Sequence, residues 1–458
     1  MTDVENTLSQ LRQALGDAQV LTGEAISQRH YSDWTRNAPA CPAALILPRS
    51  TEEVSTALRI CNAAGQPVVP QGGMTGLAGG AEPTTRDFAL SLDRLRGIQE
   101  IDVAAATVSV GAGTTLQEIQ QAVADAGYLF PLDLGARGSC QIGGNIATNA
   151  GGNAVIRYGM TRELVLGLEV VLADGRVLNL MNKMIKNNCG YDLKQCFIGS
   201  EGTLGVITRA VLKLAPPPGD TTTLLCALPD YASAVALLRR IQRDAGTPQA
   251  YEVMWQDFFR MGVSWLENPV APMSDQHPLY VLLESSARRE VLEQSLSDAV
   301  DADEVVDAII ASSHAQARGL WKIREATAEF PTRLAPLNFD ISLPIGQIGE
   351  FADLCRERLH ARWPGNHSVY FGHIGDSNLH LTVDCHSLPQ PAPILEIEEL
   401  VYAAVGELDG AVSAEHGIGL LKREFLHHSV SDEALAVMRQ LKSTFDPNGI
   451  LNPGKVLG

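Results

Sequence analysis

Apolar positions recur with a helical period twice in the first third of the chain, and a short apolar strand and a glycine-rich loop follow each time. In the first segment, Ser50 and Glu53 have the spacing of a capping box, and the apolar positions after them lie roughly on one helical face. Gly65 is expected to end this helix, and "PVVP" predicts a short buried strand. This order predicts a loop held by a rigid helix and strand.

The second segment, "GTTLQEIQQAVADAGYLFPLDLGARG", has the same organisation. Thr114 and Gln117 are expected to cap its helix, Gly127 to end it, and "YLF" to form the strand. Both predicted strands run into a proline and then into glycines, so we expect the two loops to serve one ligand. The two segments differ too much to count as a sequence repeat.

Strand patterns dominate farther along the chain. The stretch "VLGLEVVLADGRVLNL" predicts a hairpin on an Asp174-Gly175 turn, and a proline-rich break at 215–220 predicts a domain boundary. Residues 221–385 then mix strand patterns such as "LYVLLES" with helical ones, and a helical pattern resumes at about residue 393. The mixture predicts an α+β fold rather than βαβ repetition.

Composition narrows the classes of function. With 458 residues the chain is expected to form two domains or three, and its 45% hydrophobic and 19% charged residues are typical of a folded soluble protein. A net charge of -18 argues against a surface for nucleic acid or for anionic membranes, although it leaves a locally basic site for an anionic substrate open. The acidic opening stretch, the lack of an 18-residue apolar run and eight cysteines without a C-x-x-C pair predict a cytoplasmic protein with reduced thiols and no membrane span.

The glycine-rich loops predict a phosphate-containing ligand. "PQGGMTGLAGG" has five glycines in eleven residues and "GARGSCQIGGNIATNAGG" has six in eighteen. Glycine allows close backbone approach, so successive N–H groups can point at one anion. Either loop alone could simply mark turns, but both together with "GSEGTLG" favour a dinucleotide. The spacing matches neither G-x-G-x-x-G nor a Walker loop, which argues for another way of holding it.

Two histidines in "FGHIGDSNLH" predict a metal site. If Gly375 to Asn378 closes a hairpin, Ile374 pairs with Leu379 and His373 pairs directly with His380. Their Cβ atoms would then lie roughly 5 Å apart on one face, which suits two imidazoles on one cation. The alternative is that both histidines are satisfied by ordinary hydrogen bonds.

The stretch "SAEHG" offers further groups, Glu415 and His416. A carboxylate with two imidazoles is a common ligand set of catalytic zinc, and it leaves a coordination position open for substrate. Because adjacent residues point in different directions, Glu415 and His416 are expected to have separate roles.

At this point the chain resembles a known family. "PQGGMTGLAGG", "PLDLGARGSCQIGGNIATNAGG", "FIGSEGTLGVITRAVLKL" and "FDPNGILNPGKVL" are similar to FAD-linked oxidases and dehydrogenases of the vanillyl-alcohol-oxidase type. "YFGHIGDSNLHLTV" and "VSAEHGIGLLKRE" resemble the D-2-hydroxyglutarate and D-lactate dehydrogenases within it. The resemblance implies a two-subdomain FAD-binding domain over 1–216, a substrate domain with an antiparallel sheet flanked by helices over 217–440, and a segment over 441–458 that returns to the flavin.

The resemblance also assigns residues to the cofactor. The positions expected to contact FAD are Pro70, Gly72, Gly73, Met74, Thr75, Gly76, Pro131, Leu132, Gly135, Gly138, Ser139, Gly143, Gly144, Asn145, Thr148, Gly151, Gly202, Ile207 and Asn452. Some relatives attach FAD through a histidine just after the paired glycines of the first loop. Met74 stands there in this chain, so the flavin is expected to be non-covalent.

For the metal, the resemblance implies that Glu415 completes a site with His373 and His380, and that His416 is the catalytic base. Zinc is expected from the ligand types, although the same set accepts manganese, cobalt or iron. A 2-hydroxy acid would bind the cation through its hydroxyl and carboxylate, His416 would take the hydroxyl proton, and the α-hydrogen would leave as hydride to flavin N5.

Substrate contacts follow from the same likeness. Arg324 matches an arginine that binds the substrate carboxylate, and the alternative is a surface salt bridge with Glu325 or Glu329. Asn378 could hydrogen-bond a ligand imidazole or face the flavin. Asn338 and Thr382 stand where the 2-hydroxyglutarate enzymes typically have lysine and asparagine, so a second substrate carboxylate is less strongly implied.

The expected function is therefore that of an FAD-dependent D-2-hydroxyacid dehydrogenase acting on a 2-hydroxyglutarate-like or lactate-like acid. The alternatives are an oxidase that uses O₂, for example on glycolate, and a flavoprotein subunit serving mainly electron transfer. The electron acceptor (a quinone, an electron-transfer flavoprotein or a cytochrome) stays open, and a homodimer is possible.

Overall fold

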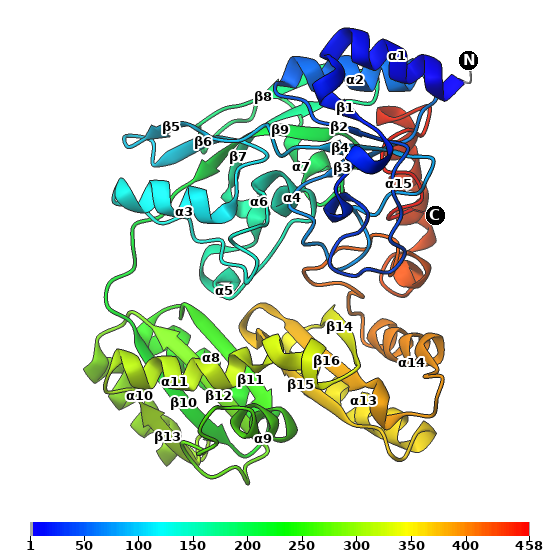
Figure 1. The fold of residues 1–458 in the computed structure, drawn as a ribbon. Helices are drawn as coiled ribbons and strands as arrows, with labels where there is room; N and C mark the ends of the chain where they lie inside the picture. The colour runs from blue at the N-terminus through cyan, green and yellow to red at the C-terminus, as the bar shows by residue number, and fades with distance from the viewer. Residues whose placement is uncertain (1–2, 458) are drawn as a thin grey trace. The chain divides into compact units, whose positions relative to one another are not determined.

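The structure, a computed structural model, describes residues 3–457 and divides the chain into two compact units (Figure 1). Unit 1 takes in the chain up to Gly152, the segment Tyr158–Pro217, and the chain from Glu415 onward. Unit 2 takes in Asn153–Arg157 and Pro218–Ala414. These two units are defined by the contacts within each of them. The predicted functional domains, 1–216, 217–440 and 441–458, stay a prediction.

Unit 1 contains two sheets. The four-stranded sheet has the order β1-β2-β4-β3, with β1 and β2 antiparallel and the other neighbours parallel. Its strands are β1 (Val20–Leu21), β2 (Ala44–Ile46), β3 (Val68–Gln71) and β4 (Phe88–Ser91), and it is accompanied by α1 (Asp3–Leu15) and α2 (Thr51–Ala64).

The second sheet of unit 1 is antiparallel, with the order β5-β6-β9-β7-β8. Its strands are β5 (Ile98–Asp102), β6 (Thr107–Gly111), β7 (Val165–Val171), β8 (Val177–Leu180) and β9 (Val206–Lys213). The helices near it are α3 (Leu116–Asp125), α4 (Ile142–Ala147), α6 (Thr161–Leu164) and α7 (Lys194–Phe197). One hydrophobic core, including Phe88 of the first sheet and Val108 of the second, joins the two sheets.

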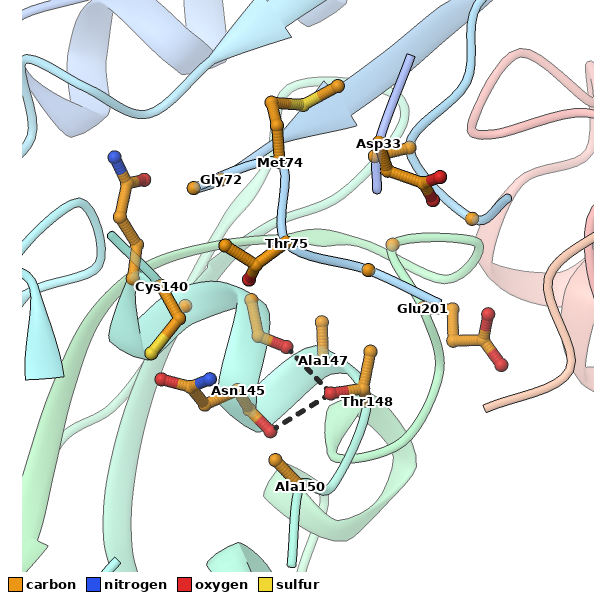
Figure 2. A pocket seen from close by; sticks show the side chains of 18 of the residues that line it. Asp33, Gly72, Met74, Thr75, Cys140, Asn145, Ala147, Thr148, Ala150 and Glu201 are labelled. Carbon is orange, nitrogen blue, oxygen red and sulfur yellow. Dashed lines mark hydrogen bonds between the residues drawn. The ribbon is translucent and has the colours of Figure 1, made fainter. Parts of the chain in front are cut away.

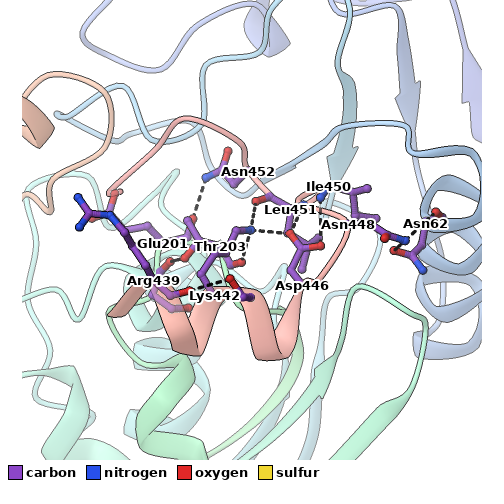
Figure 3. Close-up of polar contacts among 12 residues, drawn as sticks. Asn62, Glu201, Thr203, Arg439, Lys442, Asp446, Asn448, Ile450, Leu451 and Asn452 are labelled. Carbon is purple, nitrogen blue, oxygen red and sulfur yellow. Dashed lines mark hydrogen bonds and ion pairs between the residues drawn. The ribbon is translucent and has the colours of Figure 1, made fainter. Parts of the chain in front are cut away.

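The C-terminal segment completes unit 1. It contains α15 (Asp432–Phe445), after which Leu451 pairs with Val68 of β3 in a parallel bridge. Lys442 of α15 fixes the segment around Leu451, because its Nζ donates to the carbonyl oxygens of Thr203 and Leu451 at 2.8 and 2.7 Å (Figure 3). The last segment of unit 1 is thus fastened to the strand that leads into the first glycine-rich loop.

Unit 2 is built on a seven-stranded sheet in the order β13-β10-β12-β11-β15-β16-β14, and every neighbouring pair is antiparallel. The strands are β10 (Thr222–Leu228), β11 (Ala250–Trp255), β12 (Leu279–Ser285), β13 (Asp307–Ile310), β14 (Pro336–Ser342), β15 (Ser368–Gly372) and β16 (Asn378–Asp384). The helices are α8 (Tyr231–Ala245), α9 (Gln256–Ser264), α10 (Arg289–Asp301), α11 (His314–Arg324), α12 (Phe330–Arg333), α13 (Ile348–Arg362) and α14 (Ile394–Glu407), while α5 (Val155–Tyr158) begins in this unit.

Helices flank this sheet because its strands are apolar on both faces. Leu225 and Tyr280 pack with Phe258 of α9 and Leu320 of α11 in one core. Helix α8, with buried leucines such as Leu237, contacts β10 and β12 of the same sheet. The predicted α+β class, with a two-part unit and an antiparallel sheet flanked by helices, is confirmed.

Several local predictions are confirmed. Ser50 accepts a hydrogen bond from the Glu53 N–H at the start of α2, and Gly65 ends that helix in the left-handed conformation at φ 61°. The hairpin of β7 and β8 turns through Asp174 and Gly175, with Val171 opposite Val177. These elements depend on residues close in sequence, which is why the pattern sufficed.

Two local predictions are wrong. The cap of α3 is Thr115, which forms a reciprocal capping box with Glu118, whereas the Thr114 hydroxyl donates to the carbonyl of Gly111. "YLF" forms no strand, because Leu129 makes only one bridge, to Ala215. Pro131 follows two residues later and has no N–H for the next rung of an antiparallel ladder.

Two remaining expectations concern the chain as a whole. The eight cysteines are all free, in agreement with the predicted reduced thiols. Among the described helices, none has the length and apolar character needed to cross a membrane.

Candidate active site

A cavity of about 380 Å³ lies in unit 1, where the glycine-rich loops meet (Figure 2). Its walls are the loop after β3, the segment from Leu134 to Gly151, and the turn that begins at Glu201 before β9. Glu415 and His416 also line it. The prediction that both glycine-rich loops serve one ligand therefore has a structural basis.

The first loop brings bare backbone to the cavity. A Cβ on Gly73 would lie 2.1 Å from the Ser139 carbonyl oxygen, so only glycine allows the two loops to pack this closely. Met74 has a positive φ of 60°. Within the described residues, the N–H groups of residues 72–76 donate to no protein acceptor. Such a run of available N–H groups suits an anion.

The second loop leads into α4. A Cβ on Gly143 would lie 2.8 Å from the Cβ of Ala112, whereas a Cβ on Gly144 would meet nothing within 4 Å. Gly143 therefore packs against the core and Gly144 exposes backbone to the cavity.

Two buried side chains in the cavity wall each have an oxygen without a hydrogen-bond partner. The Oε1 of Gln141 and the Oδ1 of Asn145 are buried and accept no hydrogen bond. Because buried acceptors are rarely left unsatisfied, these two atoms fit a bound group with hydroxyl or N–H donors. Together with the free N–H groups of the first loop, they fit a dinucleotide.

Most residues predicted to contact FAD line the cavity. They are Pro70, Gly72, Gly73, Met74, Thr75, Gly76, Gly135, Gly143, Gly144, Asn145, Thr148, Gly151, Gly202 and Ile207. The other predicted positions, Pro131, Leu132, Gly138, Ser139 and Asn452, do not line it.

Two of these other positions, Ser139 and Asn452, support the walls. Ser139 lies against Gly73, and the Asn452 amide donates to the carbonyl oxygens of Gly80 and Glu201 at 2.9 and 2.7 Å. A direct contact of either residue with the cofactor remains a prediction.

In unit 2 the two histidines come together, but not in the predicted register. His380 of β16 pairs with Phe371, so His373 lies two residues beyond that pair and begins the turn Ile374–Asp376. The predicted direct pairing of His373 with His380 is wrong, because the tight turn leaves Ile374 outside the ladder. A shift of two residues keeps side chains on the same face, and the imidazole centroids lie 5.4 Å apart.

The sequence analysis missed Glu252, which organises this site. Its Oε1 lies 2.6 Å from Nδ1 of His373, and its Oε2 accepts from Nε of Arg324 at 2.8 Å. Burial works to raise the pKa of Glu252, but the charges and hydrogen bonds of His373 and Arg324 outweigh it and hold the pKa at about 2. The signal for this residue was a lone carboxylate in the apolar strand "AYEVMW".

Arg324 is buried rather than on the surface. Its side chain is 9% exposed, it pairs with Glu252, and its guanidinium carbon lies 4.8 Å from the centroid of Phe371. The alternative of a surface salt bridge with Glu325 or Glu329 is therefore wrong. Lys322, by contrast, is exposed.

The remaining predicted substrate residues lie on β14 and β16. The Asn378 amide donates to Oδ1 of Asp340 at 2.8 Å, and its own Oδ1 is buried without a partner. Asn338 and Thr382 face each other across the two strands and share a hydrogen bond of 2.8 Å. The two residues that differ from the family pattern, Asn338 and Thr382, thus form one cross-strand pair.

His373 and His380 belong to a residue group that could hold a metal ion. A carboxylate on Nδ1, as Glu252 is on His373, is the usual partner that orients a metal-bound imidazole. This donor set suits a divalent cation such as zinc.

Glu415 and His416 belong to unit 1. Oε1 of Glu415 accepts the N–H of Gly152 at 2.8 Å, and both residues line the cavity there. Ala414, the last residue of unit 2, donates its N–H to the carbonyl of Asp340 on β14, the strand opposite His380. The last residue of unit 2 is therefore bonded to β14, the strand that pairs with β16 and its His380.

Comparison with known families gives two matches. Residues 42–181 match the family described as FAD binding domain, and residues 217–456 match the family described as FAD linked oxidases, C-terminal domain. The chain is 38% identical over 454 residues to the D-2-hydroxyglutarate dehydrogenase of Xanthomonas citri pv. viticola, covering 97% of this chain and 96% of that protein. It is 39% identical over 432 residues to the mitochondrial D-2-hydroxyglutarate dehydrogenase of Bos taurus, covering 93% and 78%.

Solved structures are similar in fold. p-Cresol methylhydroxylase has a TM-score of 0.79 at 15% identity, covering 99% of this chain and 96% of that one. The 4-ethylphenol oxidase of Gulosibacter chungangensis has a TM-score of 0.77 at 20% identity, covering 99% and 97%. At these identities the likeness shows the fold alone.

Proposed function

The chain belongs to the FAD-linked oxidase family, as its motifs predicted, and from that premise we propose that it is an FAD-dependent D-2-hydroxyacid dehydrogenase. It would oxidise a D-2-hydroxy acid to the 2-oxo acid. The observation that carries the proposal is the cluster in unit 2, where two adjacent imidazoles share a face with a buried arginine held by Glu252. Two imidazoles that can bind a metal, beside a guanidinium that Glu252 holds in place, suit a substrate that has a hydroxyl next to a carboxylate.

We propose that FAD binds in the cavity of unit 1. The N–H groups of residues 72–76 would hold its phosphates, and Gln141 and Asn145 would accept from its hydroxyl or ring N–H groups. When bound, FAD supplies the acceptor for the hydride. Met74, at the position where some relatives attach the flavin, has no group that forms such a bond, so the cofactor would be non-covalent.

We further propose that His373, His380 and Glu415 bind one divalent metal, zinc by ligand type. When bound, the metal lowers the pKa of the substrate hydroxyl. Glu252 would orient His373 through Nδ1. Manganese, cobalt and iron also accept this ligand set.

His416 is proposed as the base that takes the hydroxyl proton. Because its neighbour Glu415 would be the metal ligand, the imidazole of His416 is kept for proton transfer. Arg324 is proposed to bind the substrate carboxylate. Only its Nε bonds to Glu252, so the two terminal nitrogens, with four of the five donors, remain for an anion.

The test is an anaerobic panel of D- and L-2-hydroxy acids, followed by the flavin absorbance of the holoenzyme. We expect D-2-hydroxyglutarate or D-lactate to bleach the flavin and the L-enantiomers to leave it oxidised. If no hydroxy acid bleaches the flavin, the dehydrogenase assignment fails and the electron-transfer subunit is favoured. Rapid reoxidation by air would favour the oxidase.

The role of His416 has its own variant. His416→Ala should keep FAD but slow flavin reduction by about 10²-fold or more, the usual contribution of a general base. His386→Ala, at a histidine whose side chain is 69% exposed, is the matched control and should reduce at the normal rate. Normal reduction in His416→Ala would exclude it as the base.

A further inference from the structure

Glu201, in the "GSEGTLG" motif, has a backbone conformation that is unusual for a residue with a side chain. Its φ is 51°, in the left-handed region that is unfavourable for a residue with a side chain. Hydrogen bonds hold it there from both sides. Its N–H donates to the carbonyl of Ala147 at 2.8 Å, and its own carbonyl accepts from the Asn452 amide at 2.7 Å (Figure 3).

The carboxylate of Glu201 binds the backbone of the segment that follows His416. Oε1 accepts the N–H of Ile418 at 2.7 Å, and Oε2 accepts the N–H of Gly419 at 2.9 Å. The residue is only 9% exposed, and burial raises the pKa of its carboxyl group. Both oxygens of a buried carboxylate are therefore committed to two successive N–H groups, which fixes the path of the chain there.

The glycines on either side of Ile418 are the counterpart of this contact. A Cβ on Gly417 would lie 2.8 Å from Oε1 of Glu201, and a Cβ on Gly419 would lie 2.1 Å from the carbonyl oxygen of Ala78. Both glycines have positive φ, 81° and 51°. The "EHGIG" stretch is thus shaped to lie against Glu201 on one side and the first glycine-rich loop on the other.

We propose that Glu201 is a positioning residue for the catalytic segment, which it locks against the wall of the flavin cavity so that His416 and Glu415 face that cavity. Glu201, Glu415 and His416 all line the same cavity in unit 1. The motif thus supplies a supporting side chain as well as the cavity-lining Gly202. The expected effect on turnover rests on the proposed function, whereas the effect on the segment 415–419 does not.

The first test measures the segment itself. In holoenzyme, amide hydrogen exchange over residues 414–422 should be at least about tenfold faster in Glu201→Gln than in the parent protein, because one carboxylate oxygen becomes an amide that cannot accept an N–H. Glu201→Ala should lose the protection entirely. Glu169→Gln is the matched control and should leave exchange over 414–422 unchanged. Its buried carboxylate accepts from the hydroxyls of Thr51 and Thr208 and lies 3.6 Å from a terminal nitrogen of Arg209.

The second test measures chemistry. In Glu201→Gln, kcat for the hydroxy acid should fall by about 10- to 100-fold, the effect of displacing a catalytic group by about 1 Å, while KM and flavin content change little. A fall in flavin content with normal turnover per flavin would show instead that Glu201 serves the cofactor, and would overturn the proposal.

The two tests separate the two proposals. Unchanged exchange over 414–422 in both Glu201 variants would overturn the positioning role whatever the enzyme does. If exchange accelerates as expected but the parent protein reduces its flavin with no hydroxy acid, the proposed function has failed and the contact between Glu201 and the segment stands.

Discussion

At the scale of single residues, the site of unit 2 depends on a charge that the chain buries at the centre of a sheet. Glu252 is 1% exposed, yet it stays ionised because His373 and Arg324 lie on its two oxygens. A buried ion pair seldom adds stability over an apolar core, but removing one partner leaves the other charge unpaired. Glu252 is therefore best understood as a support that fixes the directions of two functional side chains.

Glu252→Gln should accordingly destabilise the protein by roughly 3 kcal/mol, because it leaves the Arg324 charge buried without a counter-charge. Equilibrium unfolding in urea measures this. Glu284→Gln, one strand away, is the control. Its carboxylate accepts only from the indole of Trp321, so the loss there should be near 1 kcal/mol. Equal losses in the two variants would contradict the supporting role of Glu252.

At the scale of elements, the hairpin of β15 and β16 shows which features a local pattern can predict. The face of His373 and His380 was predictable, because side chains alternate with a period of two. Their direct pairing was not, because the register depends on a short helical turn whose geometry the sequence "IGDS" does not reveal. An error of two residues preserves the face, and so the two imidazoles still lie side by side despite the wrong register.

Two adjacent glycines of α4 allow a prediction that separates a packing role from a role in cofactor binding. Gly143→Ala should lower the stability of the protein by about 1 to 3 kcal/mol, since its Cβ would overlap Ala112. Gly144→Ala should leave the apoprotein stable but weaken FAD binding at least about tenfold, because its Cβ enters open space in the cavity. Thermal unfolding of apoprotein and flavin titration distinguish the two. Undiminished FAD affinity in Gly144→Ala would place the flavin elsewhere.

At the scale of the whole molecule, the chain assembles its functional groups from distant segments. The glycine-rich loops were predictable because each is a continuous run, and 14 of the predicted FAD residues line one cavity. Glu252 and Glu201 were missed because their partners lie 121 and 217 residues away, at His373 and Ile418. No local pattern encodes such pairs, so long-range positioning is the part of the site that only the structure reveals.

Metal removal is the test that belongs to this scale. After treatment with a chelator, the holoenzyme should keep its flavin spectrum, but reduction by a D-2-hydroxy acid should slow by at least about a hundredfold, since Lewis-acid stabilisation is worth several kcal/mol. Added zinc, manganese or cobalt should restore the rate. Full activity in metal-free protein, verified by elemental analysis, would contradict a role for His373, His380 and Glu415 as ligands.

The way the C-terminal segment pairs with β3 has a consequence during protein synthesis. Asn452 bonds to Gly80, 372 residues earlier in the chain, and Leu451 joins Val68 in a bridge. A ribosome therefore delivers all of unit 2 before unit 1 can close. Until then, we expect the nascent part of unit 1 to expose the unpaired edge of β3. We therefore expect chaperones to bind it, and FAD to bind it early.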